Sequence, residues 1–246
     1  KQKTAYEISL GLVGSEMCIR DRNWRVSSLD KFTLLSCSDA HSLSGYRLGR
    51  EANVFSGPLD YKEMIKAIKH KDRNKFLFTV EVDPAYGKYH FDGHRKCQVR
   101  FHPKESIERG NICPVCRKPL TIGVLHRVEE LADREEGYIP KDAIPFKTIL
   151  PLQELIAHYF GTPLTSKKVE ELYHSFLSCG SEYDVLLKKS EDELNKINKE
   201  LAPVILANRM GKIEVDPGYD GVYGVPKIGK GSQRTFVHQT MLKDFF

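Results

Sequence analysis

The sequence predicts an α/β fold that carries a small Cys/His module and ends in a mainly helical region. An amphipathic helix pattern over residues 60–70 is followed by apolar alternation over residues 76–82, which is typical of a half-buried strand. Histidine and cysteine then concentrate between positions 84 and 119. Beyond them, helical patterns occupy most of positions 123–211.

Composition places the chain among globular proteins with room for one large core or two small ones. It has 246 residues, of which 40% are hydrophobic. Lysine and arginine total 38 against 33 aspartate and glutamate, a balance that permits a polyanionic partner without requiring one. Three of the six cysteines fall between positions 97 and 116, which favours a metal site in an intracellular protein over a disulfide framework. No stretch reaches the roughly 20 apolar residues that span a bilayer, so no membrane partner is expected.

The first 22 residues differ from the rest of the chain. The apolar stretch over residues 8–22 is short for a secretory signal, is flanked or interrupted by Glu7 and Glu16, and lacks a small-residue cleavage pattern. Its letters SLGLVGSEMCIRDR resemble a translated sequencing-adapter leader. We therefore expect residues 1–22 to be non-native and the gene to be truncated at its 5′ end. The alternative is a native strand and loop.

A strand is expected over residues 32–37, and a carboxylate and an imidazole, Asp39 and His41, follow it. Residues at i and i+2 of a strand leave on the same face, and this pair of ligand types suits a hydrolytic metal ion. Two ligands are too few for a site. The alternative is an aspartate that caps the next turn and a surface histidine.

The spacing of histidine and cysteine in residues 84–122 is typical of a zinc module. A C-x-x-C turn presents two thiolates to one ion, because its tight loop directs backbone amides toward the sulfurs, and an H-x-x-C pair upstream completes a tetrahedron. The four expected ligands are His94, Cys97, Cys113 and Cys116. Such a Cys3His site is closed to water and therefore structural. His90 and His102 are alternative fourth ligands, and reduced cysteines in a core are the alternative to zinc.

Basic residues surround these expected ligands. They are Arg95, Lys96, Arg100, Lys104, Arg109, Arg117 and Lys118. A basic zinc module commonly contacts phosphates, although charges beside such modules also serve only to keep a surface solvated.

Residues 123–229 are expected to be helical with a strand–turn–strand end. The longest pattern begins at Ser190, which forms an S-x-x-E capping box with Glu193, and stops before Gly211. Pro203 is expected to kink this helix or to split it in two.

Residues 230–246 form a polar tail whose end is strongly patterned. The patterned residues are Gln239, Leu242, Phe245 and Phe246. One tight turn would place the leucine and the two aromatic rings on one face as an apolar plug, with the glutamine at its edge. This pattern resembles the peptide box that docks onto DNA sliding clamps of the archaeal and eukaryotic type, so a sliding clamp is an expected partner. A terminus folded onto its own core is the alternative.

Several longer motifs together resemble one family of nucleases. They are SDAHS, LGREAN, GKYHFDGHRKC, NICPVC, LTIGVLHRVEELADR and DPGYDGVYG. From about Asn23 to its end the chain resembles the larger, C-terminal part of endonuclease Q, a member of the polymerase-and-histidinol-phosphatase (PHP) superfamily. The resemblance implies a C-terminal remnant of a PHP β/α barrel over residues 23–83, then a zinc-ribbon module, a helical region and a flexible tail.

The resemblance also implies an activity and a location. The family cleaves the DNA phosphodiester on the 5′ side of deaminated bases (uracil, hypoxanthine, xanthine) and of abasic sites, inside the cell and in association with the nucleoid. In PHP proteins the last metal motif is D-x-H at a strand end, which Asp39 and His41 match as catalytic metal ligands. Clustered Zn2+, Mg2+ or Mn2+ ions generate hydroxide and stabilise the leaving oxyanion.

Lesion selection is expected to involve extrusion of the nucleotide, because a weakened base pair lowers its cost. The candidate contacts to phosphate or base are Arg47, Arg50, Tyr219 and Tyr223. Turn packing and surface charge are the alternative for each.

The sequence departs from the PHP pattern at one place. The family pattern includes an earlier H-x-H motif and further Glu and His ligands, yet no histidine precedes His41. We therefore expect this chain alone to be inactive and its full-length parent to be a DNA repair endonuclease. Two other functions remain open: a non-enzymatic zinc-ribbon adaptor that binds DNA and recruits a sliding clamp, and a PHP-type phosphoesterase that acts on a small phosphomonoester.

Overall fold

The computed structural model describes residues 20–38, 40 and 48–229. The chain divides into two compact units, each with buried apolar side chains. The first unit runs to Lys147 and also includes Pro217–Gly224. The second unit comprises Thr148–Asp216 and the residues from Val225 onward. Residues 217–224 therefore pack with a part of the chain that lies far from them in the sequence.

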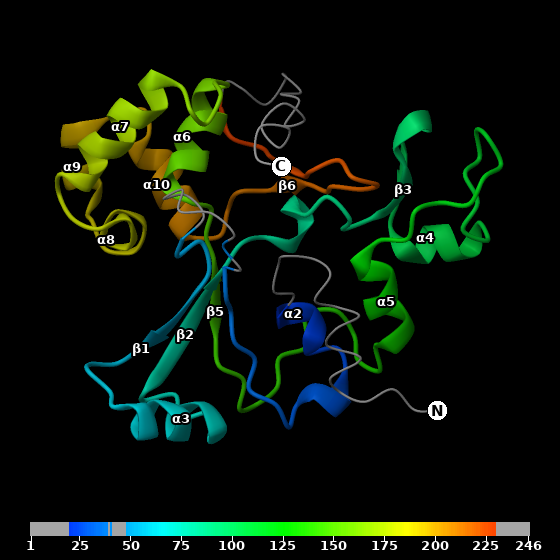
Figure 1. The fold of residues 1–246 in the computed structure, drawn as a ribbon, viewed down its shortest axis with the longest axis horizontal. Coiled ribbons are helices and arrows are strands. Elements are labelled where there is room, and N and C mark those ends of the chain that lie inside the picture. Colours follow the sequence, from blue (N-terminus) through cyan, green and yellow to red (C-terminus); the bar gives the residue numbers. More distant parts are fainter. Residues whose placement is uncertain (1–19, 39, 41–47, 230–246) are drawn as a thin grey trace. The chain divides into compact units, whose positions relative to one another are not determined.

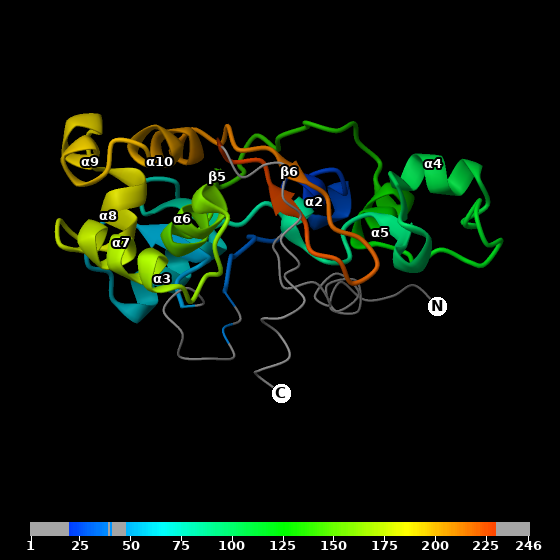
Figure 2. The same cartoon turned by 90° about the horizontal axis from the view of Figure 1, so that it is seen from above.

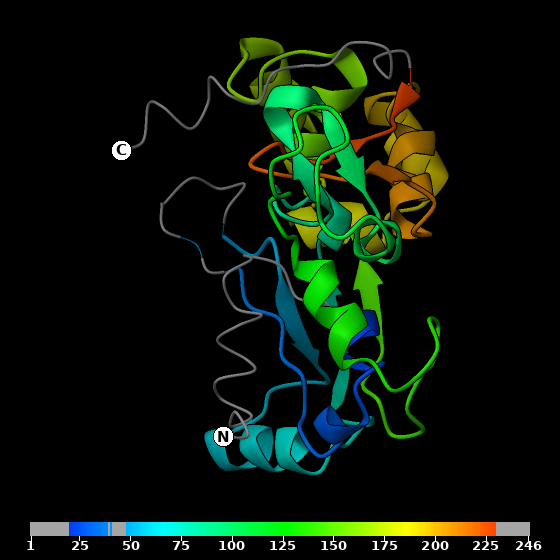
Figure 3. The ribbon, with the colours of Figure 1, turned by 90° about the vertical axis from the view of Figure 1, so that its right-hand side faces the viewer.

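A three-stranded sheet in the order β1–β2–β5 lies in the first part of the chain (Figure 1). Strand β1 (Ala52–Phe55) pairs antiparallel with β2 (Phe76–Glu81), and β5 (Phe146–Thr148) flanks the other edge of β2. Figure 3 shows the strands side by side from a second direction. The strand predicted over residues 76–82 is confirmed, and its first residue, Phe76, is fully buried.

Helix α3 (Tyr61–Lys69) begins where the sequence predicts. The Asp60 carboxylate accepts a hydrogen bond from the Glu63 backbone N–H, and the Glu63 carboxylate accepts one from the Asp60 backbone N–H. This reciprocal capping box satisfies two backbone donors that the helix leaves unpaired. Ala67 of the helix packs against Phe76 of β2, and this contact holds the helix against the sheet.

The strand predicted over residues 32–37 is wrong, because this segment pairs with a side chain and not with another strand. Asn53 Nδ2 donates to the Ser36 carbonyl at 2.6 Å, and the Ser36 N–H donates to Asn53 Oδ1 at 3.0 Å. The Ser36 hydroxyl lies 3.0 Å from both Glu51 Oε2 and the Val80 carbonyl. A side-chain amide offers the same donor and acceptor as a backbone, and here it replaces the rung of a sheet.

The first unit also contains a short hairpin with two helices. Strand β3 (Asp92–His94) pairs antiparallel with β4 (Val99–Phe101). Helix α4 (Pro103–Glu108) follows the hairpin directly, and helix α5 (Val124–Leu131) follows after a longer connection. His94 ends β3, Cys97 lies in the turn between β3 and β4, and Cys113 and Cys116 lie in the connection between α4 and α5.

The second unit is mainly helical (Figure 2). Its helices are α6 (Leu152–Phe160), α7 (Lys167–Leu177), α8 (Glu182–Leu187), α9 (Glu191–Ile197) and α10 (Ala202–Arg209). Leu155, Phe176 and Ile205, from three different helices, are fully buried and supply part of its core. No helix in the described ranges is long and apolar enough to cross a membrane.

The predicted long helix after Ser190 is two helices. Ser190 and Glu193 form the expected capping box at the start of α9. The chain breaks before α10, and Pro203 lies in the first turn of that helix, where a missing backbone N–H costs no hydrogen bond. Gly211 follows the end of α10 with a φ of 64°. The short antiparallel strands β6 (Val215–Asp216) and β7 (Val225–Pro226) confirm the predicted strand–turn–strand end.

We predict that Asn53→Ala releases residues 32–38, because the Ser36 backbone loses both of its hydrogen bonds to the amide. Removing a buried hydrogen-bonding partner costs about 1–3 kcal/mol, so the midpoint of denaturant unfolding should fall accordingly. Amide hydrogen exchange should accelerate over residues 32–38 more than over α3. Asn74→Ala is the matched control, since Asn74 is an exposed asparagine. Equal exchange in the two variants would contradict the role of Asn53.

Candidate metal centre

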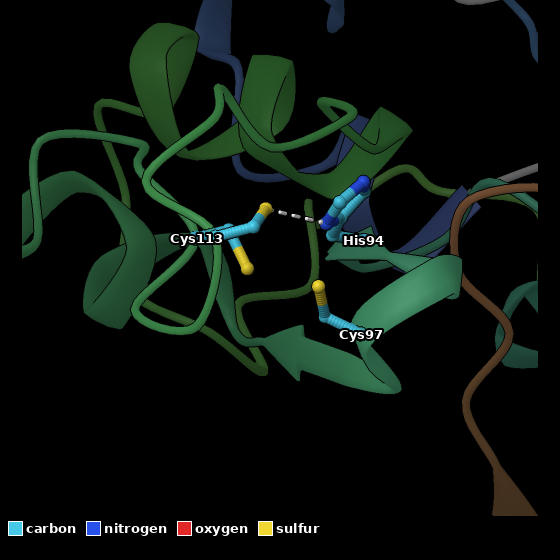
Figure 4. Close-up of side chains that lie close together, drawn as sticks. His94, Cys97 and Cys113 are labelled. Carbon is cyan, nitrogen blue, oxygen red and sulfur yellow. Dashed lines mark hydrogen bonds between the residues drawn. The ribbon is translucent and has the colours of Figure 1, made fainter.

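Four side chains from two turns of the first unit converge on one point. They are His94, Cys97, Cys113 and Cys116. Their ligand atoms all lie within 4.8 Å of one another, and Figure 4 shows three of these side chains directed toward a shared centre. Ligands of a tetrahedral zinc ion stand about 3.5–3.8 Å apart for bond lengths of roughly 2.1–2.3 Å. Small side-chain rotations therefore suffice for this cluster to hold a metal ion, as its spacing predicts.

The two turns share one backbone feature. Gln98 directly follows Cys97 with a φ of 53°, and Arg117 directly follows Cys116 with a φ of 62°. A left-handed conformation is unfavourable for residues with a side chain. Its occurrence after both ligand pairs indicates that both turns require this backbone conformation. The Arg117 N–H donates to the Cys113 carbonyl at 2.9 Å and closes the second turn.

The pKa values of the Cys113 and Cys97 thiols are shifted in opposite directions. Burial raises the pKa of Cys113, but hydrogen bonds from the Cys116 backbone N–H, the His94 side chain and the Val115 backbone N–H outweigh it and hold that pKa at about 6. Burial, together with the neighbouring Cys116 and Cys113 thiols, raises the pKa of Cys97 to about 11. Backbone donors thus already favour one thiolate, which is the form of cysteine that binds metals.

The two alternative histidine ligands have other roles. His90 is 3% exposed, and its Nε2 lies 2.9 Å from Arg22 Nη1. His102 precedes α4, and its Nδ1 accepts a hydrogen bond from the Lys104 N–H at 3.3 Å. Neither histidine belongs to the cluster of four ligands.

A buried carboxylate, Asp92, connects the hairpin that carries His94 to two neighbouring helices. Asp92, two residues before His94, is fully buried. It accepts hydrogen bonds from the Gly123 N–H at 2.7 Å, from His126 Nδ1 at 2.6 Å and from the Ser106 hydroxyl. Asp92 therefore joins β3, α4 and α5. Sequence reasoning missed it, because its partners lie 14 to 34 residues along the chain.

The loop of residues 217–224 is fixed to the same turns. The Asp220 carboxylate accepts hydrogen bonds from the Arg95 N–H at 2.6 Å and from the Thr121 hydroxyl at 2.7 Å. A Cβ atom at Gly224 would lie 2.1 Å from the Ala85 carbonyl oxygen, so only glycine permits this close approach of two backbones. The DPGYDGVYG motif thus folds as a tight cover on residues 85–121.

The structure places three of the predicted DNA contacts beside other aromatic or cationic groups. The Arg50 guanidinium lies 5.4 Å from the Tyr86 ring centroid, and the Tyr86 ring lies 6.4 Å from the Tyr223 ring. The Arg100 guanidinium lies 6.0 Å from the Tyr219 ring. Their role in DNA binding stays a prediction.

Several predicted residues lie outside the described part of the chain. They are Asp39, His41, Arg47, Gln239, Leu242, Phe245 and Phe246. Sequence reasoning also missed two buried carboxylates of the first unit, Glu51 and Glu81, which are 5% and 3% exposed. Glu81 accepts from the Thr79 hydroxyl at 2.7 Å, and Glu51 from the Ser36 hydroxyl. Glutamate is rarely buried. A glutamate inside the apolar alternation of residues 76–82 is the sequence signal that could have identified Glu81.

Comparison with protein families and curated proteins shows one matching family and two related proteins. A family described as the MJ0043 C-terminal domain matches residues 151–212. The uncharacterized protein MJ0043 of Methanocaldococcus jannaschii is 37% identical over 206 residues, which are 81% of this chain and 26% of that protein. The uncharacterized protein YqxK of Bacillus subtilis is 31% identical over 220 residues, or 88% of this chain and 51% of that protein. The chain thus spans a quarter to a half of these relatives.

Two solved structures are similar to this chain. The lesion-specific endonuclease PfuEndoQ from Pyrococcus furiosus matches with a TM-score of 0.78 at 31% identity, over 92% of this chain and 56% of that one. Endonuclease Q in complex with a 27-mer duplex substrate that has an abasic lesion at the active site matches with a TM-score of 0.74 at 31% identity, over 90% and 56%. The resemblance to endonuclease Q that the sequence predicts is confirmed.

We predict that the purified chain holds one zinc ion and that Cys113→Ala abolishes this stoichiometry, because three ligands do not close a tetrahedral site. Cys179→Ala is the matched control, since Cys179 lies outside the cluster. Native mass spectrometry and atomic emission spectrometry measure the number of zinc ions per chain. Acidification should also release the ion, because thiolates and imidazole bind protons in competition with it. A full metal content in Cys113→Ala would contradict the assignment.

We predict that His90 makes folding stability fall at acid pH. Burial, with smaller contributions from Arg22 and His102, lowers the pKa of His90 to about 3. Between about pH 6.5 and pH 3 the unfolded chain therefore binds a proton that the folded chain does not bind, and stability is lost as pH falls, by at most about 1.4 kcal/mol per pH unit.

His90→Gln should flatten this dependence, because glutamine does not titrate. Denaturant unfolding from pH 7 to pH 4 measures the slope, and His70→Gln, at an exposed histidine, is the control. A slope that His90→Gln leaves unchanged would contradict the prediction.

Proposed function

The chain is related to endonuclease Q along about nine-tenths of its length, and from this relationship we propose that it is part of a metal-dependent endonuclease that cleaves DNA at deaminated or abasic nucleotides. The observation that carries the proposal is the similarity, at 31% identity, to a structure whose active site holds an abasic lesion in a DNA duplex. The proposed cleavage is hydrolysis of the phosphodiester on the 5′ side of uracil, hypoxanthine, xanthine or an abasic site.

In this proposal residues 23–83 are the C-terminal part of a PHP barrel. Asp39 and His41 supply ligands to its cluster of divalent ions, which are Zn2+, Mg2+ or Mn2+. When bound, such ions lower the pKa of a coordinated water and neutralise charge on the phosphoryl oxygens. Ser36, three residues before Asp39 in the sequence, is buried and donates a hydrogen bond to Glu51 at 3.0 Å.

The zinc ribbon at residues 84–122 is proposed to position DNA and not to cleave it. Its four-ligand cluster has no open coordination position once an ion is bound, which is typical of structural sites. Exposed cations surround it: Arg95, Lys96, Arg100, Lys104, Arg109, Arg117 and Lys118. Contacts from such residues to phosphates fix the register of a duplex without reading its sequence. Arg47, Arg50, Tyr219 and Tyr223 are the proposed contacts closest to the lesion.

The tail is proposed to recruit a DNA sliding clamp. The residues proposed to enter the clamp are Gln239, Leu242, Phe245 and Phe246. Such recruitment would hold a repair nuclease near newly replicated DNA at a raised effective concentration.

A DNA-binding adaptor is the second candidate function. The observation in its favour is that no histidine precedes His41, so these 246 residues offer few ligands for a catalytic metal cluster. The adaptor requires the zinc ribbon, the cationic surface and the tail, and it requires nothing of Asp39.

We predict that the chain binds a duplex with one abasic site, uracil, hypoxanthine or xanthine more tightly than the intact duplex, and that it cleaves none of them above the level of Asp39→Asn. Fluorescence anisotropy measures binding, and denaturing electrophoresis after incubation with Mg2+ or Mn2+ measures nicking. The expected preference is about fivefold or more, since a weakened pair lowers extrusion cost by about 1 kcal/mol or more.

Each other outcome is informative. Robust nicking that Asp39→Asn abolishes would show that the chain is active alone and would exclude the adaptor. Equal affinity for intact and lesion-containing duplexes would contradict the lesion-directed function.

A further inference from the structure

A row of cationic and aromatic side chains crosses the first unit. Its members, which we call the tyrosine row, are Arg50, Tyr86, Tyr223, Lys88 and Tyr89. Lys88 Nζ lies 5.8 Å from the Tyr223 ring centroid and 5.6 Å from the Tyr89 ring centroid, so one ammonium group is close to two aromatic rings. Tyr223 in turn contacts Tyr86, which carries Arg50 on its ring.

One end of the tyrosine row is accessible and the other is anchored. Tyr89 is 40% exposed, whereas Tyr86 is 4% exposed. Lys88 forms no ion pair with any carboxylate among the described residues, so its charge is available to an external anion. A second cation, Arg95, also lies near Tyr89. A Cβ atom at Gly221 would lie 3.6 Å from Arg95 Nη1 and 3.8 Å from the Tyr89 hydroxyl, so both groups are close to the same point.

Backbone hydrogen bonds hold the row rigid. The Gly221 N–H donates to the Lys88 carbonyl at 2.9 Å, and the Gly224 N–H donates to the Tyr86 carbonyl at 3.0 Å. Tyr223 lies between these two bonds in the sequence. The backbone that carries Tyr86, Lys88 and Tyr223 is therefore held in place before a ligand binds, and preorganisation of this kind favours affinity.

The chemistry of the row fits a nucleotide whose base is not paired. A tyrosine face stacks on any nucleobase, and a nearby ammonium attracts the phosphate that accompanies the base. Within a duplex, however, both faces of a base are covered by its neighbours in the stack. Only an unstacked or single-stranded nucleotide offers a free face to Tyr89 and a phosphate to Lys88.

We infer that Tyr89, Tyr223 and Lys88 form a binding site for an unpaired nucleotide of DNA, in which the base stacks on tyrosine and the phosphate contacts Lys88 and Arg95. The inference rests on the proposed function to the extent that DNA is the ligand. It adds a site beside the zinc ribbon, and it assigns single-stranded character to the DNA that occupies this site.

The test measures binding of the whole chain to a short single strand, without added divalent metal. The strand carries 2-aminopurine, whose fluorescence falls when it stacks. Tyr89→Ala should weaken binding about five- to one-hundred-fold and restore the fluorescence, while Tyr89→Phe should stay within about twofold of wild type, because it keeps the ring. Lys88→Ala should lower the dependence of log affinity on log salt by about 0.7.

A matched control exists elsewhere in the first unit. Tyr138 is 43% exposed, and its ring lies 4.3 Å from the Arg134 guanidinium, outside the tyrosine row. Tyr138→Ala should leave binding of the single strand unchanged. Circular dichroism and zinc content equal to wild type exclude misfolding of each variant.

The outcomes separate this inference from the proposed function. If the chain binds the single strand and Tyr89→Ala binds it equally well, the tyrosine row is not the site, and the nuclease proposal stands. If wild type prefers an intact duplex to the single strand, the inference is also overturned. If the chain shows no lesion preference but Tyr89→Ala still weakens binding of the single strand, the site stands and the lesion-directed function fails.

Discussion

The convergence of His94, Cys97, Cys113 and Cys116 is the constraint on which the surrounding structure depends. Of the described residues 84–122, only Ala85, Tyr86, Cys113 and Leu120 are buried hydrophobic residues. A segment with so small an apolar core gains little free energy from burial, and metal coordination is the usual replacement. The two turns, each with a left-handed residue after its second ligand, are stable together because one centre joins them.

Two carboxylates extend this constraint to distant parts of the chain. Asp92 joins the ligand-bearing hairpin to α4 and α5, and Asp220 joins it to the loop of residues 217–224. That loop brings Tyr219 and Tyr223 to a surface that already carries Lys88 and Arg100. A structural metal site can thereby govern the proposed DNA-binding surface, which contains none of its ligands, since it fixes the elements from which that surface is built.

Local patterns in the sequence predicted local structure well, and contacts between distant residues account for what they missed. The capping boxes at Asp60 and Ser190 are complete within four residues, and the ligand spacing near Cys113 is set by one turn, so each was predictable. The segment at Ser36 was predicted as a strand because nothing local reveals that Asn53 would take the place of a partner strand. The Asp92 network and the tyrosine row likewise depend on pairings that only the folded chain creates.

The central claim is that the metal cluster organises the surface that is proposed to bind DNA. The most direct test follows the affinity of the chain for a single-stranded oligonucleotide during titration with a zinc chelator and after zinc is restored, with the circular dichroism of the second unit's helices recorded in parallel. The account predicts that affinity falls in proportion to zinc loss and returns with zinc, while the helical signal persists. An unchanged affinity in the zinc-free chain would contradict it.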